Sequence, residues 1–396
     1  MAGRRKYDPG ATDAAGDRDD ADGLDRLVRR DGIASPRPED GHPAASPREM
    51  LTSPLSGVLS VQMRKEIPDT PMINAPAIPG PVDAAAPLFI VLNMGSGADD
   101  AVKTRKIIEG VLTEAGREHR LQVVADATRL HDIARQTVEA ARARRGVVVA
   151  AGGDGTINAM AQATLGSGCP IGVLPLGTFN YFSRTHGIPA DLAGATRLLL
   201  TARAHPVQVG LVNDRVFLIN ASLGMYPELL EDREAFKRKF GRTRLVAVGA
   251  GVVTVLRHHR QLRLSIEQGG STRQMRTPTL FVGNNSLQLE QAGIAEAPLL
   301  AQGQLAAVTL RPMGTLTMLW LAVRGAFGRL GEAESVTSFA FRRIVVRPAM
   351  PYGTRRVKVA IDGEITWLRA PIEFRVAPEA LHLLKPDPVS AADLSS

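Results

Sequence analysis

Residues 146–158 read GVVVAAGGDGTIN, and this stretch decides the fold. The apolar run at 147–151 predicts a buried strand, and the glycines that follow end that strand abruptly. The next residues, TINAMAQATLG (156–166), predict a helix. A strand, a glycine-rich turn and a helix in direct succession are typical of a parallel sheet covered by helices.

The same order of strand, turn and helix occurs on both sides of that stretch. PLFIVLNMGSG (87–97) contains a strand that ends in asparagine and glycines, and CPIGVLPLGT (169–178) ends in a similar way. LQVVAD (121–126) predicts one further strand. This part of the chain is therefore predicted to be an α/β domain. Its helical patterns lie at 98–116, 127–145, 179–187 and 192–202.

After residue 206 the pattern changes to short alternating strands, of which two are predicted at 205–224 and one at 339–348. Several of these strands are joined by pairs of turn residues: Asn213-Asp214, Gly269-Gly270 and Asp362-Gly363. Two helices are predicted to interrupt the strands, at about 228–258 and at 315–330. Such strands predict an antiparallel β-sandwich. The fold class is thus predicted as α/β, with an N-terminal parallel-sheet domain followed by an antiparallel β-sandwich domain.

The composition bounds the class of protein and its partners. A single cysteine, Cys169, excludes a disulfide framework and fits a reducing compartment. The net charge of +8 favours an anionic partner, although an arginine-rich genome would give the same balance. No apolar run reaches the roughly 18–20 residues that span a bilayer, and the N-terminus has no apolar signal region. We expect a cytoplasmic protein.

The first residues of the chain differ from the rest. They lack hydrophobic periodicity and are rich in Asp, Ala, Pro and Arg, so they cannot bury enough apolar surface to offset their ordering entropy. We expect a disordered tail and linker there, or an extension upstream of a later true start. The expected parts are 1–84 (tail and linker), 85–205 (α/β domain), 206–375 (sandwich) and 376–396 (a segment that returns to the first domain before a disordered end).

Three apolar strands of the first domain end in small and polar residues directly before a helix. In a parallel sheet these turns share the carboxyl edge, where ligands bind. Glycine lets the backbone approach a phosphate, and helix N-termini direct N–H groups at it. The sequence therefore predicts a phosphate or nucleotide site. Its candidate residues are Asn93, Gly95, Ser96, Gly97, Gly152, Gly153, Asp154, Gly155, Thr156, Ile157, Asn158, Gly177, Thr178 and Asn180.

Asp154 is the one acid in this set. No GxxxxGK[ST] loop is present, and GGDG does not match the GxGxxG pattern of dinucleotide sites. A carboxylate beside a polyphosphate is useful if it holds a metal ion or accepts a proton from an attacking hydroxyl. The alternative is that Asp154 only stabilises the turn.

Two motifs in this order, GGDGTIN (152–158) and GVLPLGTFNYFSR (172–184), resemble the catalytic domain of the diacylglycerol kinase, sphingosine kinase and ceramide kinase family. The resemblance is closest to the stand-alone bacterial lipid kinases and extends over about 85–385. It includes NASLG (220–224) and IDGE (361–364).

The resemblance implies an ATP site in a cleft between the α/β domain and the sandwich, with Mg²⁺ accompanying the ATP. It also implies that Glu364, with Asp362 nearby, accepts a proton from the lipid hydroxyl; in some relatives the acid equivalent to Asp154 has that role. The local pattern alone indicates only a two-residue hairpin turn at Asp362-Gly363.

The sequence departs from the family pattern at three positions. Met94 stands where a proline is usual, and Ala159 stands where a glutamate is usual. Gln302 precedes Gly303 where bacterial relatives often have an aspartate that binds a structural magnesium ion. A neutral amide is a poor sole anchor for Mg²⁺, which argues against a structural metal site at Gln302.

The sequence therefore predicts an ATP-dependent lipid kinase, with a diacylglycerol-like acceptor by default. Its substrate would lie at the membrane surface, where the basic cluster FKRKFGRTR (236–244) or the apolar face of a helix at 315–330 could make peripheral contact. No motif indicates nucleic acid. The alternatives are a kinase for sphingoid bases or other small lipids, an NAD-kinase-like enzyme with a soluble acceptor, and a nucleotide- or lipid-binding protein without turnover.

Overall fold

The computed structural model of the chain describes most of the residues after 84. It covers 85–94, 98–225, 261–314, 333–349 and 355–387, with isolated positions at 83, 227, 317, 318, 320, 321, 324 and 329–331. The predicted tail and the helix predicted at about 228–258 lie outside the described residues, as do most of 315–330 and the turn residues Gly95, Ser96 and Gly97.

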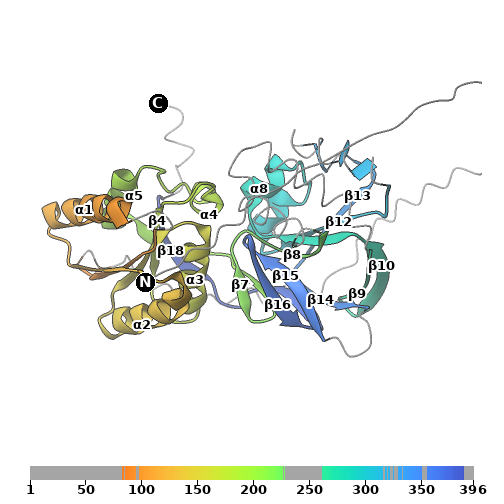
Figure 1. The fold of residues 1–396 in the computed structure, drawn as a ribbon, viewed down its shortest axis with the longest axis horizontal. Coiled ribbons are helices and arrows are strands. Elements are labelled where there is room, and N and C mark those ends of the chain that lie inside the picture. Colours follow the sequence, from red (N-terminus) through yellow and green to blue (C-terminus); the bar gives the residue numbers. More distant parts are fainter. Residues whose placement is uncertain are drawn as a thin grey trace, which may run out of the picture. The chain divides into compact units, whose positions relative to one another are not determined.

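The first sheet has six strands in the order β2-β1-β3-β4-β18-β5 (Figure 1). All neighbours are parallel except β18 and β5, which are antiparallel. β18 comes from the C-terminal end of the chain and lies between β4 and β5. The strands are β1 (Leu88–Leu92), β2 (His119–Val123), β3 (Val147–Gly152), β4 (Ile171–Pro175), β5 (Arg203–Val207) and β18 (Leu381–Lys385).

Helices cover both faces of this sheet. Because β1, β3 and β4 are covered on both sides, every residue in them is buried, which explains their continuous apolar runs. In Figure 1 the contacting pair α1 and α5 lies on one face, and the contacting pair α2 and α3 lies on the other. The helices are α1 (Ala98–Glu114), the short 3₁₀ helix η1 (Ala127–Arg129), α2 (Leu130–Ala143), α3 (Asp154–Thr164), α4 (Tyr181–Thr185) and α5 (Leu192–Thr201).

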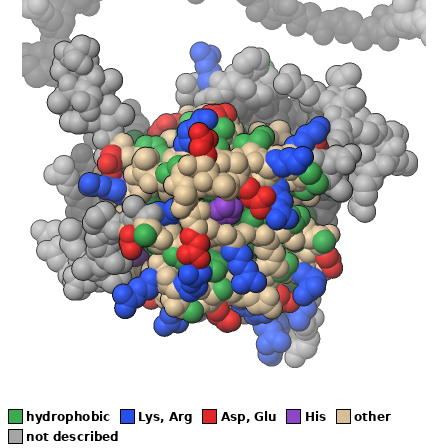
Figure 2. Space-filling view, turned by 90° about the vertical axis from the view of Figure 1, so that its left-hand side faces the viewer, with side chains coloured by type: hydrophobic (Ala, Val, Ile, Leu, Met, Phe, Trp, Pro, Cys, Tyr) green, Lys and Arg blue, Asp and Glu red, His purple; other side chains and the backbone are tan. Residues whose placement is uncertain are grey.

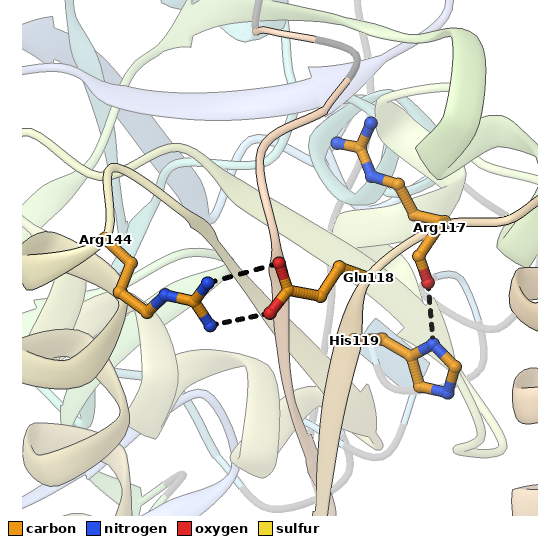
Figure 3. Close-up of polar contacts among 4 residues, drawn as sticks. All are labelled: Arg117, Glu118, His119 and Arg144. Atoms are coloured by element: carbon orange, nitrogen blue, oxygen red, sulfur yellow. Dashed lines mark hydrogen bonds and ion pairs between the residues drawn. The ribbon is translucent and has the colours of Figure 1, made fainter.

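The amino edge of the first sheet is held by polar contacts (Figure 3). Arg144, just after α2, forms two contacts with the carboxylate of Glu118, at 2.6 and 3.2 Å. Nδ1 of His119, at the start of β2, hydrogen-bonds to the Arg117 carbonyl at 2.9 Å. Both partners of the ion pair are more than half exposed, so we expect it to contribute at most about 1 kcal/mol.

The remaining strands form two antiparallel sheets, ordered β10-β9-β14-β17-β6-β7 and β13-β12-β11-β8-β15-β16. One apolar cluster joins their inner faces, with Phe217 and Phe374 from one sheet and Leu223 and Val359 from the other, which confirms the predicted sandwich. The strands are β6 (Gly210–Val212), β7 (Arg215–Phe217), β8 (Asn220–Gly224), β9 (Leu262–Gln268), β10 (Ser271–Thr277), β11 (Thr279–Gly283), β12 (Leu305–Leu310), β13 (Val336–Phe341), β14 (Arg343–Pro348), β15 (Arg356–Ile361), β16 (Glu364–Arg369) and β17 (Ile372–Val376).

Two short helices pack on the outer face of the third sheet. They are α8 (Ser286–Gln291) and the 3₁₀ helix η2 (Ala297–Gln302). Leu289 and Leu300 from these helices form a small apolar cluster with Val308 of β12. No helix among the described residues is long and apolar enough to cross a membrane.

The predicted strand boundaries need two corrections. The stretch 205–224 does not form two strands but four short ones, β5 to β8, which are distributed over all three sheets. The stretch 339–348 is not one strand either, because the chain changes sheets at Arg342, between β13 and β14. Strand pattern alone does not show where a chain turns a sandwich corner. The expected domain limit at 205/206 falls inside β5.

Candidate functional site

The turns after β1, β3 and β4 lie together at one edge of the first sheet. The three strands are adjacent and parallel, so their carboxyl ends point the same way. A cavity of about 540 Å³ lies at this edge. It is lined by residues from all three turns, from the start of α2 and from the sandwich: Asn93, Met94, Ala127, Leu130, His131, Gly153, Gly155, Thr156, Asn158, Ala159, Leu176, Gly177 and Glu364.

Gly153 and Gly177 bring two of these turns into direct contact. A Cβ atom on Gly177 would lie 2.8 Å from the Cα atom of Gly153. Asn180 holds the second turn closed, because its Oδ1 accepts from the Gly177 N–H at 3.0 Å and its Nδ2 donates to the Gly177 carbonyl at 2.8 Å. The left-handed φ of Asn180, 48°, is one that asparagine tolerates well. Asn180 thus shapes the turn, while Thr178 is exposed beside it.

Gly152 and Gly155 make room for side chains of the protein itself. A Cβ atom on Gly152 would lie 2.6 Å from the hydroxyl oxygen of Thr156, and that hydroxyl accepts a hydrogen bond of 2.9 Å from Nδ2 of Asn93. A Cβ atom on Gly155 would lie 2.7 Å from Oε1 of Glu364. The missing side chain at Gly155 therefore lets Glu364 approach the first turn of α3.

Ile157 and Asn158 have structural contacts. The side chain of Ile157 is fully buried in the core of the first domain, and its N–H donates to the Gly153 carbonyl at 3.1 Å. Nδ2 of Asn158 donates to Oδ2 of Asp362 at 2.7 Å and to the Val216 carbonyl at 2.9 Å. Asn158 thereby connects α3 to the sandwich while it also borders the cavity.

Asp154 is the first residue of α3, and its carboxyl group faces the start of α4. Burial raises its pKa, and the backbone N–H groups of Phe182, Tyr181 and Asn180 act in the opposite direction. Oδ1 of Asp154 is buried and has no hydrogen-bond partner among the described residues. Asp154 does not line the cavity. Its position is therefore suited to holding the start of α4 against α3.

Asp362 lies in the turn between β15 and β16, with its carboxyl group pointing inward. Oδ2 accepts from Asn158 Nδ2 at 2.7 Å and from the Leu218 N–H at 2.8 Å. Oδ1 accepts from the N–H groups of Ile219 and Asn220 at 2.8 and 2.9 Å. Burial raises the pKa of this carboxyl to about 6, against the effect of the four donors. Both oxygens are occupied by protein groups, so Asp362 is suited to positioning the turn.

Glu364 begins β16, directly after that turn, and is exposed. It borders the larger cavity and also a second one of about 200 Å³. Of the three acids predicted to have catalytic roles, Glu364 is the one whose carboxylate is accessible and borders the larger cavity. The second cavity is lined by His131, Gly155, Asn158, Gln162, Arg215, Val216, Ile361, Asp362, Glu364, Ile365 and Thr366.

The surroundings of Gln302 do not resemble a metal site. Its backbone carbonyl accepts a hydrogen bond of 3.3 Å from Nη2 of Arg342, so a positively charged side chain lies beside it. Among the described residues there is no group of three His, Cys, Asp or Glu side chains that could hold a metal ion. The residues present therefore do not fit a structural Mg²⁺.

Sequence reasoning missed the contribution of the segment after β2. Ala127, Leu130 and His131 line the larger cavity, and His131 also lines the smaller one. No glycine marks this turn, which is why it was passed over. The topology contained the missing signal, because β2 is parallel to β1 and its following turn must reach the same edge.

Comparison with known proteins identifies the relatives of this chain. The model of the diacylglycerol kinase catalytic domain matches residues 87–212. A Klebsiella pneumoniae protein named "Probable lipid kinase YegS-like" is 37% identical over 141 residues, which are 34% of this chain and 44% of the relative. The chain spans about half the length of this and two further curated relatives, with shares of 44%, 54% and 45%.

Two other matches extend further along the chain. A crystal structure described as a diacylglycerol kinase from Bacillus anthracis superimposes with a TM-score of 0.58 at 18% identity, covering 77% of this chain and 99% of that one, and confirms the fold class. A Staphylococcus epidermidis protein named "Putative lipid kinase SERP0390" is 30% identical over 251 residues, 59% of this chain and 74% of the relative. The motifs, the fold and this coverage lead to one conclusion: the chain belongs to the diacylglycerol kinase catalytic domain family.

Proposed function

We propose that this protein is an ATP-dependent kinase that phosphorylates a lipid hydroxyl. The observation that carries the proposal is the position of Glu364, an exposed carboxylate that borders both cavities beside the first turn of α3. Membership of the family and the names of the relatives, which are lipid kinases, support it.

The larger cavity is suited to a nucleotide. It combines the N-terminal turn of α3, a natural site for anions, with the close-packed turns at Gly153 and Gly177. Asn93 and Thr156 are hydrogen-bonded to each other at its wall and supply further polar groups. When bound, ATP supplies the phosphoryl group, and Mg²⁺ that accompanies it neutralises phosphate charge.

In the proposed reaction Glu364 accepts the proton of the acceptor hydroxyl. The acceptor oxygen forms a bond to the γ-phosphorus, the bond from that phosphorus to the ADP oxygen breaks, and the proton goes to the carboxylate of Glu364. Asp362 holds the turn that carries Glu364 through its four N–H donors. Asp154 keeps the start of α4 in place.

We further propose that the acceptor is a diacylglycerol-like lipid presented at the inner face of the membrane, so that the protein is cytoplasmic, makes peripheral membrane contact and contributes to phospholipid biosynthesis. A sphingoid base and a soluble acceptor of the NAD-kinase type are the competing substrates. The proposed domain limits are 85–205 and 206–375, with 376–396 returning to the first domain.

A phosphorylation assay tests the kinase proposal. The protein is given radiolabelled ATP with diacylglycerol, a sphingoid base, NAD or no acceptor. We expect lipid phosphorylation by the wild type and a fall in kcat of about 10²–10⁴-fold in Glu364→Gln, with the KM for ATP little changed. The matched control, Glu114→Gln, alters an exposed glutamate at the end of α1 and should leave kcat unchanged.

The Asp154→Asn variant decides which acid is the base. We expect it to lose less than tenfold in kcat. If Asp154→Asn is inactive while Glu364→Gln keeps full activity, the base is Asp154. If the wild type binds ATP and phosphorylates no acceptor in the panel, the kinase proposal is wrong.

One observation favours a second candidate, a nucleotide-binding protein without turnover. Met94 and Ala159 both line the larger cavity, where the family pattern has proline and a polar glutamate. An apolar wall there removes one polar contact to a nucleotide. This candidate predicts ATP binding by titration calorimetry with no phosphorylated product.

A further inference from the structure

The β15–β16 hairpin has an unusual outward face. β16 is the last strand of its sheet, and its pairing with β15 sets Arg356 opposite Arg369 and Lys358 opposite Trp367. These four residues, which we call the hairpin face, alternate with side chains such as Val359 that pack into the sandwich core. The hairpin face therefore points away from the core.

The hairpin face combines an exposed tryptophan with positive charge. Trp367 is 57% exposed, and Nζ of Lys358 lies 5.4 Å from the centroid of its indole ring. The two arginines are exposed and directly opposite each other, a pairing that is unfavourable unless an anion lies between or beside them. The third pair on this side of the hairpin, Ala360 and Ile365, carries no charge, and Ala360 is buried.

The charges on the hairpin face differ in sign pattern from those on another side of the molecule. On the left-hand side of Figure 1, where α1 and α2 lie, basic and acidic side chains are interspersed over the described surface (Figure 2). On the hairpin face the charges have one sign. Asn213 donates through Nδ2 to the Arg369 carbonyl at 3.2 Å, so this end of the hairpin is also held to the neighbouring sheet.

We propose that the hairpin face docks on the surface of an anionic bilayer. Tryptophan prefers the headgroup level of a bilayer, and each Lys or Arg near an anionic surface adds attraction. Trp367 follows Glu364 by three residues on β16, so their Cα atoms are roughly 10 Å apart while their side chains lie on opposite sides of the hairpin. If the proposed lipid kinase function holds, docking through this face brings the strand that carries the proton acceptor to the membrane interface and leaves the Glu364 carboxylate facing the cavities.

Fluorescence of Trp367 tests the location of the contact. The chain has two tryptophans, so Trp320→Phe leaves Trp367 as the single reporter. Vesicles of phosphatidylcholine with about one third phosphatidylglycerol should shift its emission to the blue, and brominated lipid in these vesicles should quench it. If the protein sediments with the vesicles but Trp367 is neither shifted nor quenched, another surface makes the contact and the proposal is wrong. No sedimentation at all also overturns it.

Charge removal tests the partner. In Arg356→Gln/Lys358→Gln/Arg369→Gln we expect the partition coefficient onto these vesicles to fall about fivefold per charge, hence on the order of 100-fold. Trp367→Ala should weaken binding to the same vesicles. The matched controls, Arg197→Gln on α5 and Ile107→Ala on α1, alter exposed residues elsewhere and should bind as the wild type does. Equal binding by the triple variant overturns the proposal.

Activity on a short-chain acceptor in solution separates this proposal from the kinase proposal. The triple variant should phosphorylate that acceptor at the wild-type rate and lose activity only on vesicles. If no acceptor is phosphorylated by any form of the protein, the kinase proposal fails, while the sedimentation and quenching results still decide the docking surface. Equal losses in solution and on vesicles would show that the hairpin face acts within the catalytic site and would overturn the docking role.

Discussion

Two acid–glycine turns contribute to the site. Gly153-Asp154-Gly155 follows β3 in the first sheet, and Asp362-Gly363-Glu364 joins two strands of the sandwich. In both, burial raises the pKa of the aspartate. They differ in what surrounds the carboxyl group: four N–H donors occupy both oxygens of Asp362, whereas Oδ1 of Asp154 has no partner among the described residues.

The different partners of these two carboxyl groups show that an aspartate next to a glycine does not have the same role in both turns. Asp362 fixes the turn, and its neighbour Glu364 is the carboxylate left accessible at the cavities. Asp154 faces the backbone at the start of α4 and does not border the larger cavity, and its own turn contains no second acid that does.

Loss of the Asp362 carboxyl group should lower the free energy of unfolding more than any other change proposed for these turns. In Asp362→Ala the N–H groups of residues 218–220 and the amide of Asn158 lose their acceptor, so we expect the free energy of unfolding to fall by about 3–5 kcal/mol. Urea denaturation measures it. Asp132→Ala, at an exposed ion pair on α2, is the control and should change stability by less than about 0.5 kcal/mol. A loss under 1 kcal/mol in Asp362→Ala would contradict the positioning role.

The next largest effect should be the pH dependence of the difference in the free energy of unfolding between the wild type and Asp362→Ala. The folded-state pKa of Asp362, about 6, lies above the reference value of 3.8, so the folded state binds this proton more tightly. The resulting stability is fully present below pH 3.8 and is lost as pH rises through about 6. From pH 6 towards 4, the wild type should gain up to about 1.4 kcal/mol per pH unit over Asp362→Ala.

Urea denaturation at several pH values measures this difference. If the advantage of the wild type shrinks as the pH falls, the four N–H donors outweigh burial and the pKa of Asp362 is lowered instead. That result would sharpen the contrast with Asp154, whose carboxyl group has fewer competing donors.

Gly177→Ala should lower the free energy of unfolding by about 1–3 kcal/mol. Its Cβ atom would lie 2.8 Å from the backbone of Gly153, and backbone cannot move aside cheaply. Gly110→Ala is a control, because nothing lies within 4 Å of a Cβ atom there. Thermal unfolding followed by circular dichroism compares the two variants. Equal melting temperatures would mean that the two turns are not in close contact.

Gly155→Ala should change stability least, by less than about 1 kcal/mol, because its Cβ atom meets only the flexible end of Glu364. Displacing that carboxylate should nevertheless lower kcat by at least about tenfold. The kinase assay and urea denaturation together measure this split. Unchanged kcat would show that the approach of Glu364 to α3 has no role in the reaction.

The sequence was sufficient to predict the fold class and the turns that form one edge of the candidate site. The buried runs at β1, β3 and β4 required a sheet covered on both faces, and the Asp362-Gly363 turn formed as predicted, with φ angles of 47° and 90°. These features depend on local pattern. The four strands between 203 and 224 did not follow from pattern, because they are too short to show a period.

The roles of individual site residues were harder to predict from the sequence. The glycines were predicted to make room for phosphate, yet Gly155 is occupied from the protein side by Glu364, a residue from a distant strand. The sequence does not show that both oxygens of Asp362 accept hydrogen bonds, because the donors come from α3 and from residues 218–220, which lead into β8. Such contacts depend on tertiary packing between segments that sequence pattern treats separately.

The position of β18 affects how the protein can be made. β18 lies between β4 and β5, and of the described strands it is the last to be translated. Until it is made, the first sheet has an open edge at β4, and β5 has no partner in that sheet. The whole sandwich is translated in the meantime. The first domain therefore completes its sheet after the second, and a fragment ending with the sandwich would lack a central strand of the other lobe.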